Sequence, residues 1–302
     1  MKIPAIRFIS DNTNIDFMQK RYISFIFTAI LIILSILSIA TKGLNYGIDF
    51  SGGVLIEARI QPAPDLTKLR NILNNLNIGE ISLQNFSNDN SYIMIRLAKN
   101  INNHSQQQDI ELIKSAITSH FPGKIEYRKI DYVGPQVGQE LTRNGIYAIL
   151  LSFLSIMLYI WVRFEWQYGI GLIIALIHDA IVAIGFMSFA GLECNLTSVA
   201  AILTIIGYSV NDSVVIYDRI RENIRKYRKL SISELINMSI NNTLSRTILT
   251  VLTTLLATIA LIFFGGESIR SFSLVVFFGI IIGTYSSIFV SAPILIHLNL
   301  KR

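Results

Sequence analysis

Charged residues and cysteine are both scarce in this chain. Asp, Glu, Lys and Arg make up 15% of its 302 residues, whereas hydrophobic residues make up 52%. That composition is too apolar for a water-soluble domain. The single cysteine, Cys194, excludes an internal disulfide and has no partners for a metal site. The chain also has no GxxxxGK[ST] loop, no HExxH motif and no GxSxG motif. We therefore predict no ATP site, no metal, no cofactor and no enzyme activity.

Long apolar runs are abundant. A membrane-spanning helix needs roughly 17–25 mostly apolar residues, and six segments have that length: 22–40, 145–162, 168–190, 196–217, 247–264 and 272–295. The first run ends in a "SIA" sequence that resembles a cleavage site, but it is longer than the apolar core of a signal peptide. We expect it to be an uncleaved anchor. The predicted fold class is a polytopic α-helical membrane protein with six transmembrane helices.

Basic residues gather at particular ends of these runs. Lysine and arginine precede the first run, close the chain and crowd the loop 218–246. The positive-inside rule then predicts that this loop and both termini, 1–21 and 296–302, are cytoplasmic. The net charge of +6 is thus an orientation signal, and we expect no nucleic-acid partner. Within the loop, "SISE" (Ser231–Glu234) fits a capping box that would begin a short amphipathic helix on the membrane surface.

The segment 41–141 between the first two runs is hydrophilic, and the topology places it in the periplasm. Alternating apolar residues predict strands, and a 3.6-residue period predicts helices. The expected elements are a strand at 54–60, a helix at 65–76, strands at 80–86 and 91–97, a helix at 106–121 and a strand at 124–133. This βαββαβ order is that of a ferredoxin-like domain.

Two glycine-rich motifs flank the external domain. The motif "YGIDFSGG" follows the first run and "VGPQVGQEL" precedes the second. Glycine permits backbone turns that other residues resist, so the motifs form either fixed turns or a hinge for domain movement. Composition alone leaves both interpretations open. The residues concerned are Gly47, Asp49, Gly52, Gly53, Gly134, Pro135 and Gly138.

One carboxylate lies inside the fourth apolar run. Asp212 follows Asn211, about five residues past the middle of that run, before the chain leaves the bilayer. A charge there is costly unless it is paired, hydrated or protonated, so the default interpretation is a functional residue. Tyr208 lies one helical turn earlier and is placed to donate a hydrogen bond to Asp212.

Four motifs together resemble the SecD/SecF family of protein-export membrane proteins, in the resistance-nodulation-division superfamily: "GIDFSGG", "VGPQVGQEL", "GYSVNDSVVIYDRIRENIR" and "NNTLSRT". The resemblance implies a SecF-like subunit of the Sec pathway in the bacterial inner membrane. Such a subunit pairs with SecD and uses the proton motive force to help the SecYEG translocon, with YajC, move unfolded preproteins outward. The resemblance also implies that Asp212 is a proton-relay aspartate and Arg246 its basic partner. Ser213 and Tyr217 replace the threonine and phenylalanine common in the family.

The fifth run supports a close approach of its helix to Asp212. Small and polar residues recur along one stripe that starts at Arg246, a pattern that lets a helix pack closely or line a wet crevice. A mobile contact between Arg246 and Asp212 would switch the aspartate between binding and releasing a proton. A static ion pair that only locks the helices is the alternative. The stripe comprises Arg246, Thr250, Thr253, Thr254 and Ala257.

Two further intramembrane features stand out. His178 and Asp179 adjoin in the third run, where they either extend a proton path or make structural hydrogen bonds. Successive helical residues point about 100° apart, so we expect the two side chains not to form one simple site. Gly279 and Gly283 form a GxxxG motif in the last run, which predicts close helix packing.

Three functions compete on this sequence. The first is a proton-driven subunit that assists protein export. The second is half of a small-molecule exporter of the same superfamily, although the external domain of about 100 residues shows no aromatic-lined pocket. The third is a passive scaffold in which the buried charges only stabilise packing.

Overall fold

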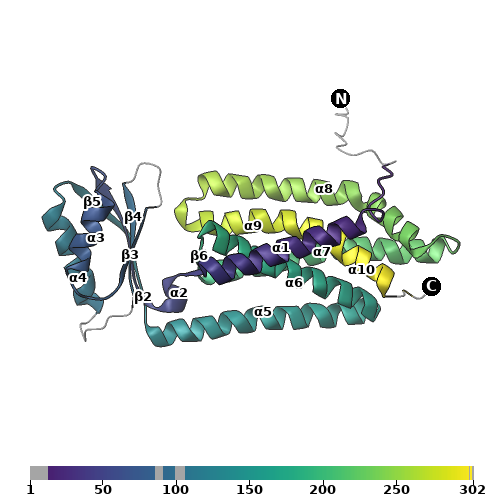
Figure 1. Cartoon of the computed structure of the whole chain (residues 1–302), viewed down its shortest axis with the longest axis horizontal. Coiled ribbons are helices and arrows are strands. Elements are labelled where there is room, and N and C mark those ends of the chain that lie inside the picture. The colour runs from purple at the N-terminus through teal and green to yellow at the C-terminus, as the bar shows by residue number, and fades with distance from the viewer. Residues whose placement is uncertain (1–12, 86–90, 99–105, 299, 301–302) are drawn as a thin grey trace, which may run out of the picture. The chain divides into compact units, whose positions relative to one another are not determined.

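The computed structural model describes residues 13–85, 91–98, 106–298 and 300. Parts of both expected cytoplasmic termini, and Phe86 at the end of an expected strand, lie outside these residues. Six helices have the length and hydropathy to cross a membrane, so the predicted number of spans is confirmed. Five of them are α1 (Arg21–Lys42), α5 (Pro135–Arg163), α6 (Trp166–Ala190), α7 (Leu196–Lys226) and α8 (Ile232–Phe264). The sixth is built from α9 (Glu267–Ser286) and α10 (Ala292–His297), both labelled in Figure 1, with the π-helical turn η1 (Ser287–Ser291) between them.

The chain divides into two compact units. The smaller unit contains the external domain, with α2 (Ile48–Ser51) leading into a four-stranded sheet. Its strands are β2 (Gly53–Gln61), β3 (Ile81–Asn85), β4 (Tyr92–Leu97) and β5 (Lys124–Val133). They lie in the order β3-β4-β2-β5, with every neighbouring pair antiparallel. With α3 (Leu66–Asn74) and α4 (Gln106–His120), this is the predicted ferredoxin-like βαββαβ arrangement.

Helices α3 and α4 cover one face of the sheet (Figure 1). Alternate residues of the strands face these helices, and the resulting core includes Ile56, Ile93, Leu69 and Ile113, all fully buried. Burying a side chain of this size stabilises the fold by about 1.5–3 kcal/mol. A sheet covered on one face leaves the other face to alternating, more polar residues.

The larger unit holds the helical bundle. In their most apolar windows, α6, α7 and the last span are 56%, 44% and 56% buried, against 17%, 11% and 11% for α1, α5 and α8. Helices α6 and α7 and the last span are the most buried and therefore form the centre of the unit. Close packing depends on small residues: a Cβ added at Gly185 of α6 would lie 2.3 Å from the Cβ of Ser35 in α1.

The segment before α1 is held against α8. The backbone N–H of Phe17 donates to the side-chain oxygen of Asn237 at 2.7 Å. Asn241 exchanges two hydrogen bonds with the backbone of Ile15, at 2.9 and 2.8 Å. Phe17 is also buried in the core of the bundle. The "NNTLSRT" motif thus contributes an asparagine that fixes the approach of the chain to its first span.

The cytoplasmic amphipathic helix differs from the expectation. Ser231 and Glu234 do form a capping box, but the helix that begins there continues without a break as α8 to Phe264. Leu235 and Ile236 are both buried rather than exposed toward a membrane surface, and Ile236 belongs to the core of the bundle. The expected position on the membrane surface is therefore wrong, because this apolar face of α8 packs inside the protein. Its partner is the end of α7, where Asn223 donates to Ser239 at 2.8 Å.

Candidate functional site

Asp212 lies on the buried side of α7, opposite α8. The residue is 7% exposed. The Thr247 hydroxyl donates to its Oδ1 at 2.7 Å. Its Oδ2 is buried and has no hydrogen-bond partner within the described part of the chain. A carboxylate with one satisfied and one unsatisfied buried oxygen is costly to keep ionised, and this arrangement is suited to binding a proton.

Arg246 does not make the expected ion pair. It is exposed on α8, and among the described residues no salt bridge joins it to Asp212. Its charge still acts on the Asp212 carboxylate through space. Thr247, the next residue, is the direct partner. The static ion pair is thus absent from this conformation, and a mobile contact remains a prediction.

The rest of the α8 stripe is largely uncovered. Thr253 and Ala257 are exposed, and Thr250 and Thr254 are half-buried. The hydroxyl of Tyr208, on α7, is buried near Asp212 and Thr254. It does not make the predicted hydrogen bond to Asp212.

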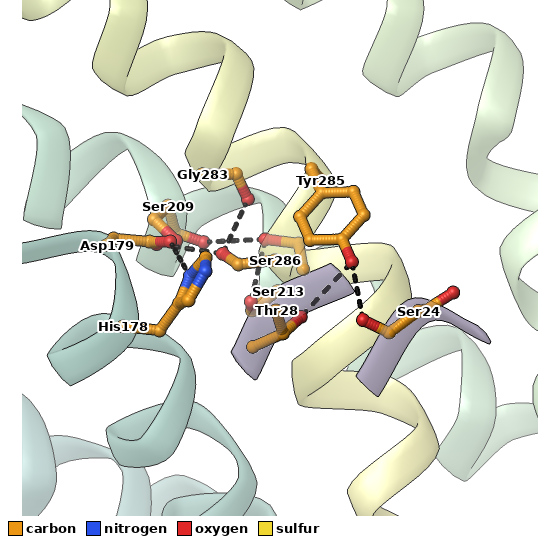
Figure 2. A network of polar contacts seen from close by, with 10 residues as sticks. Ser24, Thr28, His178, Asp179, Ser209, Ser213, Gly283, Tyr285 and Ser286 are labelled. Carbon is orange, nitrogen blue, oxygen red and sulfur yellow. Dashed lines mark hydrogen bonds and ion pairs between the residues drawn. The ribbon is translucent and has the colours of Figure 1, made fainter. Parts of the chain in front are cut away.

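A second polar cluster surrounds Asp179, which is 0% exposed (Figure 2). One carboxylate oxygen, Oδ2, accepts from the hydroxyls of Ser209 in α7 at 2.7 Å and Ser286 in α9 at 2.8 Å. The other oxygen, Oδ1, lies 3.0 Å from Nδ1 of His178. A single side chain of α6 therefore bonds to both of the other central helices.

The contact between His178 and Asp179 contradicts the expectation from helical geometry. Successive Cα–Cβ bonds do diverge by about 100°. The imidazole of His178 is nevertheless oriented so that its Nδ1 reaches the carboxylate of the next residue, Asp179. His178 is 2% exposed, and its Nε2 is buried without a hydrogen-bond partner among the described residues.

A seam of hydroxyl groups continues from this cluster along α7 and η1. Ser213 donates to Ser287 at 2.9 Å, and Ser287 donates to the backbone oxygen of Ser209 at 3.3 Å. Further along, the Tyr217 hydroxyl and the Ser291 hydroxyl share a hydrogen bond. All five side chains are fully buried. The π-helical turn supplies the serines on one side of the seam, and such turns are frequent at functional sites.

The GxxxG motif lies on the face of α9 that contacts α7. A Cβ at Gly279 would lie 2.1 Å from Cδ1 of Ile205, and a Cβ at Gly283 would lie 3.2 Å from the Cβ of Ser209. Gly283 thereby leaves space for Ser209 beside Asp179. Close packing and the polar cluster therefore depend on the same helix face.

The two glycine-rich motifs pack against each other in the smaller unit. Gly52 and Gly53 have positive φ angles of 71° and 119°, a conformation that glycine adopts readily. A Cβ at Gly52 would lie 3.2 Å from the Cα of Pro135, and one at Gly138 would lie 3.2 Å from the backbone oxygen of Phe50. These contacts explain the glycines as fixed turns. Hinge motion remains a prediction.

Asp49 and Gly47 bond to residues 194–196, which belong to the same unit as the motifs. The Asp49 carboxylate accepts from the backbone N–H of Leu196 at 2.9 Å, where a helix N-terminus favours negative charge. The backbone N–H of Gly47 donates to the oxygen of Cys194 at 2.8 Å. At Gly134 the nearest atom to an added Cβ is the Tyr132 hydroxyl, at 3.4 Å. No group of three or more potential metal ligands occurs among the residues that the structure describes.

The fold and these sites define a multi-pass membrane protein with carboxylates buried inside its helical bundle. The chain belongs to the SecD/SecF family: the model described as "Protein export membrane protein SecD/SecF, C-terminal" matches residues 112–301, and the "SecD/SecF GG Motif" model matches residues 37–64. The predicted family is confirmed. The stretch that this second model matches includes the adjacent glycines Gly52 and Gly53, where α2 ends and β2 begins.

Curated relatives extend over almost the whole chain. The protein translocase subunits SecF of Rickettsia rickettsii (strain Sheila Smith) and Rickettsia felis are each 58% identical over 98% of this chain and 95% of their own length. This likeness favours the protein-export interpretation over half of a small-molecule exporter.

Solved structures of SecDF share the fold. A crystal structure of SecDF from Thermus thermophilus, described as a translocon-associated membrane protein, has a TM-score of 0.86 and 36% identity over 96% of this chain. SecDF in a super-membrane-facing form has a TM-score of 0.70 and 37% identity over 95% of this chain. The chain covers 39% of the length of each of these SecDF chains.

Proposed function

We propose that this chain is the SecF subunit of a bacterial Sec protein translocase. With SecD, it would use the proton motive force to assist preprotein translocation across the cytoplasmic membrane. The observation that carries the proton-driven part is the buried Asp212 carboxylate, which has one hydrogen bond from Thr247 and one unpartnered oxygen. Intramembrane carboxylates of this kind mark proton pathways in transport proteins.

A partner subunit is supported by what this chain leaves uncovered. Arg246 and the threonine stripe of α8 are exposed or half-buried, an arrangement that would be costly if it faced lipid. Transporters built from repeats place their sites where the two halves meet. We expect SecD to cover this stripe, and we expect SecYEG, YajC and unfolded preproteins as further partners.

The proposed energy source is the proton gradient. A proton that crosses 100 mV releases about 2.3 kcal/mol, enough for modest repeated conformational steps. In this proposal Asp212 binds and releases the proton, Arg246 approaches it in another state, and Tyr208 lines the path. The subunit itself catalyses no covalent reaction. The glycine-rich motifs would transmit the movement to the external domain.

The proposed location is the bacterial inner membrane. Both termini and the basic loop would be cytoplasmic, and residues 41–141 would be periplasmic. The excess of Lys and Arg at the corresponding helix ends supports this orientation.

The test is Asp212→Asn in the complete translocase. Asparagine keeps the shape of the side chain and an acceptor for Thr247, but it cannot ionise. We expect normal abundance of the complex and loss of the proton-gradient-dependent part of preprotein translocation in membrane vesicles. Asp218→Asn is the matched control, because Asp218 lies on the same helix but is exposed and paired with Arg163. It should retain the proton-dependent part. Normal proton-dependent translocation by Asp212→Asn would refute the proposal.

A further inference from the structure

The Asp179 cluster is more completely enclosed than the Asp212 site. Asp179 is 0% exposed, and three side chains from three different helices contact its two oxygens: His178, Ser209 and Ser286. The serine hydroxyls satisfy Oδ2 and the imidazole contacts Oδ1. These contacts would be sufficient if the Asp179 carboxylate had only a structural role. His178 adds a feature that packing does not explain.

That feature is the far side of the imidazole ring. With Nδ1 directed to Asp179, Nε2 points away from the carboxylate and is buried without a partner within the described ranges. Neutral imidazole leaves an unused lone pair there, and imidazolium leaves an unused N–H. Histidine is the side chain whose ordinary titration falls nearest to neutral pH. An unpartnered, buried ring nitrogen is therefore an open position for one proton.

Few other ionisable groups face the pair. On the last span the ring of Tyr285 lies 6.3 Å from the His178 ring, and its hydroxyl donates to the backbone of Ser24 in α1. The stretch of α1 from Ser24 to Ser35 has no ionisable side chain. On α7 the next carboxylate is Asp212, which bonds to Thr247 on the other side of that helix.

We propose that His178 and Asp179 form a second proton-binding site, separate from Asp212, whose ligand is a single proton taken up at Nε2 of His178. Before uptake the pair consists of neutral imidazole and carboxylate, with one net negative charge. After uptake it is an imidazolium–carboxylate pair with no net charge, and no bond other than N–H forms or breaks. A carboxylate paired with an opposite charge costs less to bury than a carboxylate without one. The use of this site in transport rests on the proposed function, but proton binding itself does not.

The serines link the site to helix packing. The oxygen that accepts from α7 and α9 belongs to the same carboxylate that faces the imidazole. A change in the charge of His178 thus alters the strength of the hydrogen bonds that hold α6 to both other central helices. A change in the proton occupancy of His178 would therefore also change the hydrogen bonds of the hydroxyl seam.

The experiment is ¹⁵N NMR of the full chain in lipid nanodiscs, with the histidine rings labelled. The chain has four histidines, and replacement of His104, His120 and His297 by glutamine leaves His178 as the only labelled ring. We expect its nitrogen signals to change from neutral imidazole to imidazolium as the pH is lowered from about 9 to about 5. Asp179→Asn should abolish the imidazolium signal over that range, whereas Asp212→Asn should leave it unchanged.

Two results would overturn the proposal. One is a His178 ring that stays neutral, or stays charged, across the whole pH range in the single-histidine chain with Asp179 and Asp212 unchanged. The other is a titration that Asp179→Asn leaves unaltered. If Asp179→Asn does not fold, the wild-type titration still decides the question. Because the readout is the ring itself, failure of proton-driven export in other variants would not affect it.

Discussion

Removing the Thr247 hydroxyl should destabilise the protein by more than an ordinary threonine-to-valine change. Valine has nearly the same shape, but it cannot donate to Oδ1 of Asp212, a contact of 2.7 Å. A hydrogen bond to a charged group contributes about 1.5–3 kcal/mol. Because Oδ2 has no partner either, Thr247→Val would leave both carboxylate oxygens unsatisfied. We therefore expect a loss near the upper end of that range.

The assay is SDS-induced unfolding of the purified chain in mixed micelles, monitored by far-UV circular dichroism. Thr258→Val is the matched control. Thr258 is buried on the same helix, but its hydroxyl bonds only to backbone oxygens of α8, at 3.0 and 2.9 Å. Thr258→Val should therefore lower the free energy of unfolding by only about 0.5–1.5 kcal/mol, the contribution of a neutral hydrogen bond. Thr247→Ser, which retains a hydroxyl, should restore most of the lost stability.

A double mutant adds a second check. In an Asp212→Asn background the acceptor is neutral, and a neutral hydrogen bond contributes only about 0.5–1.5 kcal/mol. The cost of Thr247→Val should fall accordingly. Equal costs for Thr247→Val and Thr258→Val in the wild-type background would show that the hydroxyl does not support an ionised Asp212.

Three further substitutions test the packing. Gly279→Ala should lower the free energy of unfolding by about 1–3 kcal/mol through overpacking, because its Cβ would lie 2.1 Å from Ile205. The control is Gly207→Ala on α7, where an added Cβ would meet nothing. In the same unfolding assay it should be neutral or stabilising. Gly53→Ala should cost more than about 2 kcal/mol through its positive φ and a Cβ 2.2 Å from a backbone oxygen, and normal thermal stability of the full chain would contradict this. Asn241→Ala should remove two hydrogen bonds to Ile15 and speed hydrogen exchange of the Ile15 amide at least several-fold, whereas unchanged exchange would show that the segment is held elsewhere.

Hydrophobic run length and alternation were sufficient to predict the spans and the external sheet. Six apolar runs that are each long enough to cross a bilayer have few alternative explanations. The strand and helix order of residues 54–133 was confirmed because each element there has one apolar face with an unambiguous period. The run lengths did not reveal that α7 and α8 extend beyond the membrane-length segments, because polar residues continue a helix as readily as apolar ones do.

The Asp212 site shows more clearly what could not be predicted from the sequence alone. The family resemblance implied Arg246 in the next span as the partner of Asp212, and the hydrogen-bonded partner in this structure is the next residue, Thr247. Neighbouring residues on a helix differ by about 100° of rotation about its axis. The depth of a residue in the membrane follows from counting residues from the loop, whereas the rotation of a helix about its axis depends on how it packs against every neighbouring helix. A row of buried hydroxyl residues at four-residue spacing, Ser239, Thr243 and Thr247, was the signal that could have identified the correct face.

The hydroxyl seam was also missed from sequence. Ser213 and Tyr217 were noted only as departures from the family pattern, yet both hydroxyls make buried hydrogen bonds to the last span. Serine and tyrosine in an apolar run have several explanations, and their partners lie more than seventy residues away in the chain. Only the tertiary structure pairs them.

The π-helical turn η1 has a consequence for the way the last span can change. A π turn contains one more residue than an α turn, so the helix beyond it is rotated by about 100° relative to an uninterrupted α-helix. Ser291 reaches Tyr217 because that extra residue is present at 287–291. If the wide turn moved along the helix, α10 would have to rotate about its axis relative to α9, which is packed through its glycines. Such a rotation would separate Ser291 from Tyr217 and change which residues of α10 face the core of the bundle.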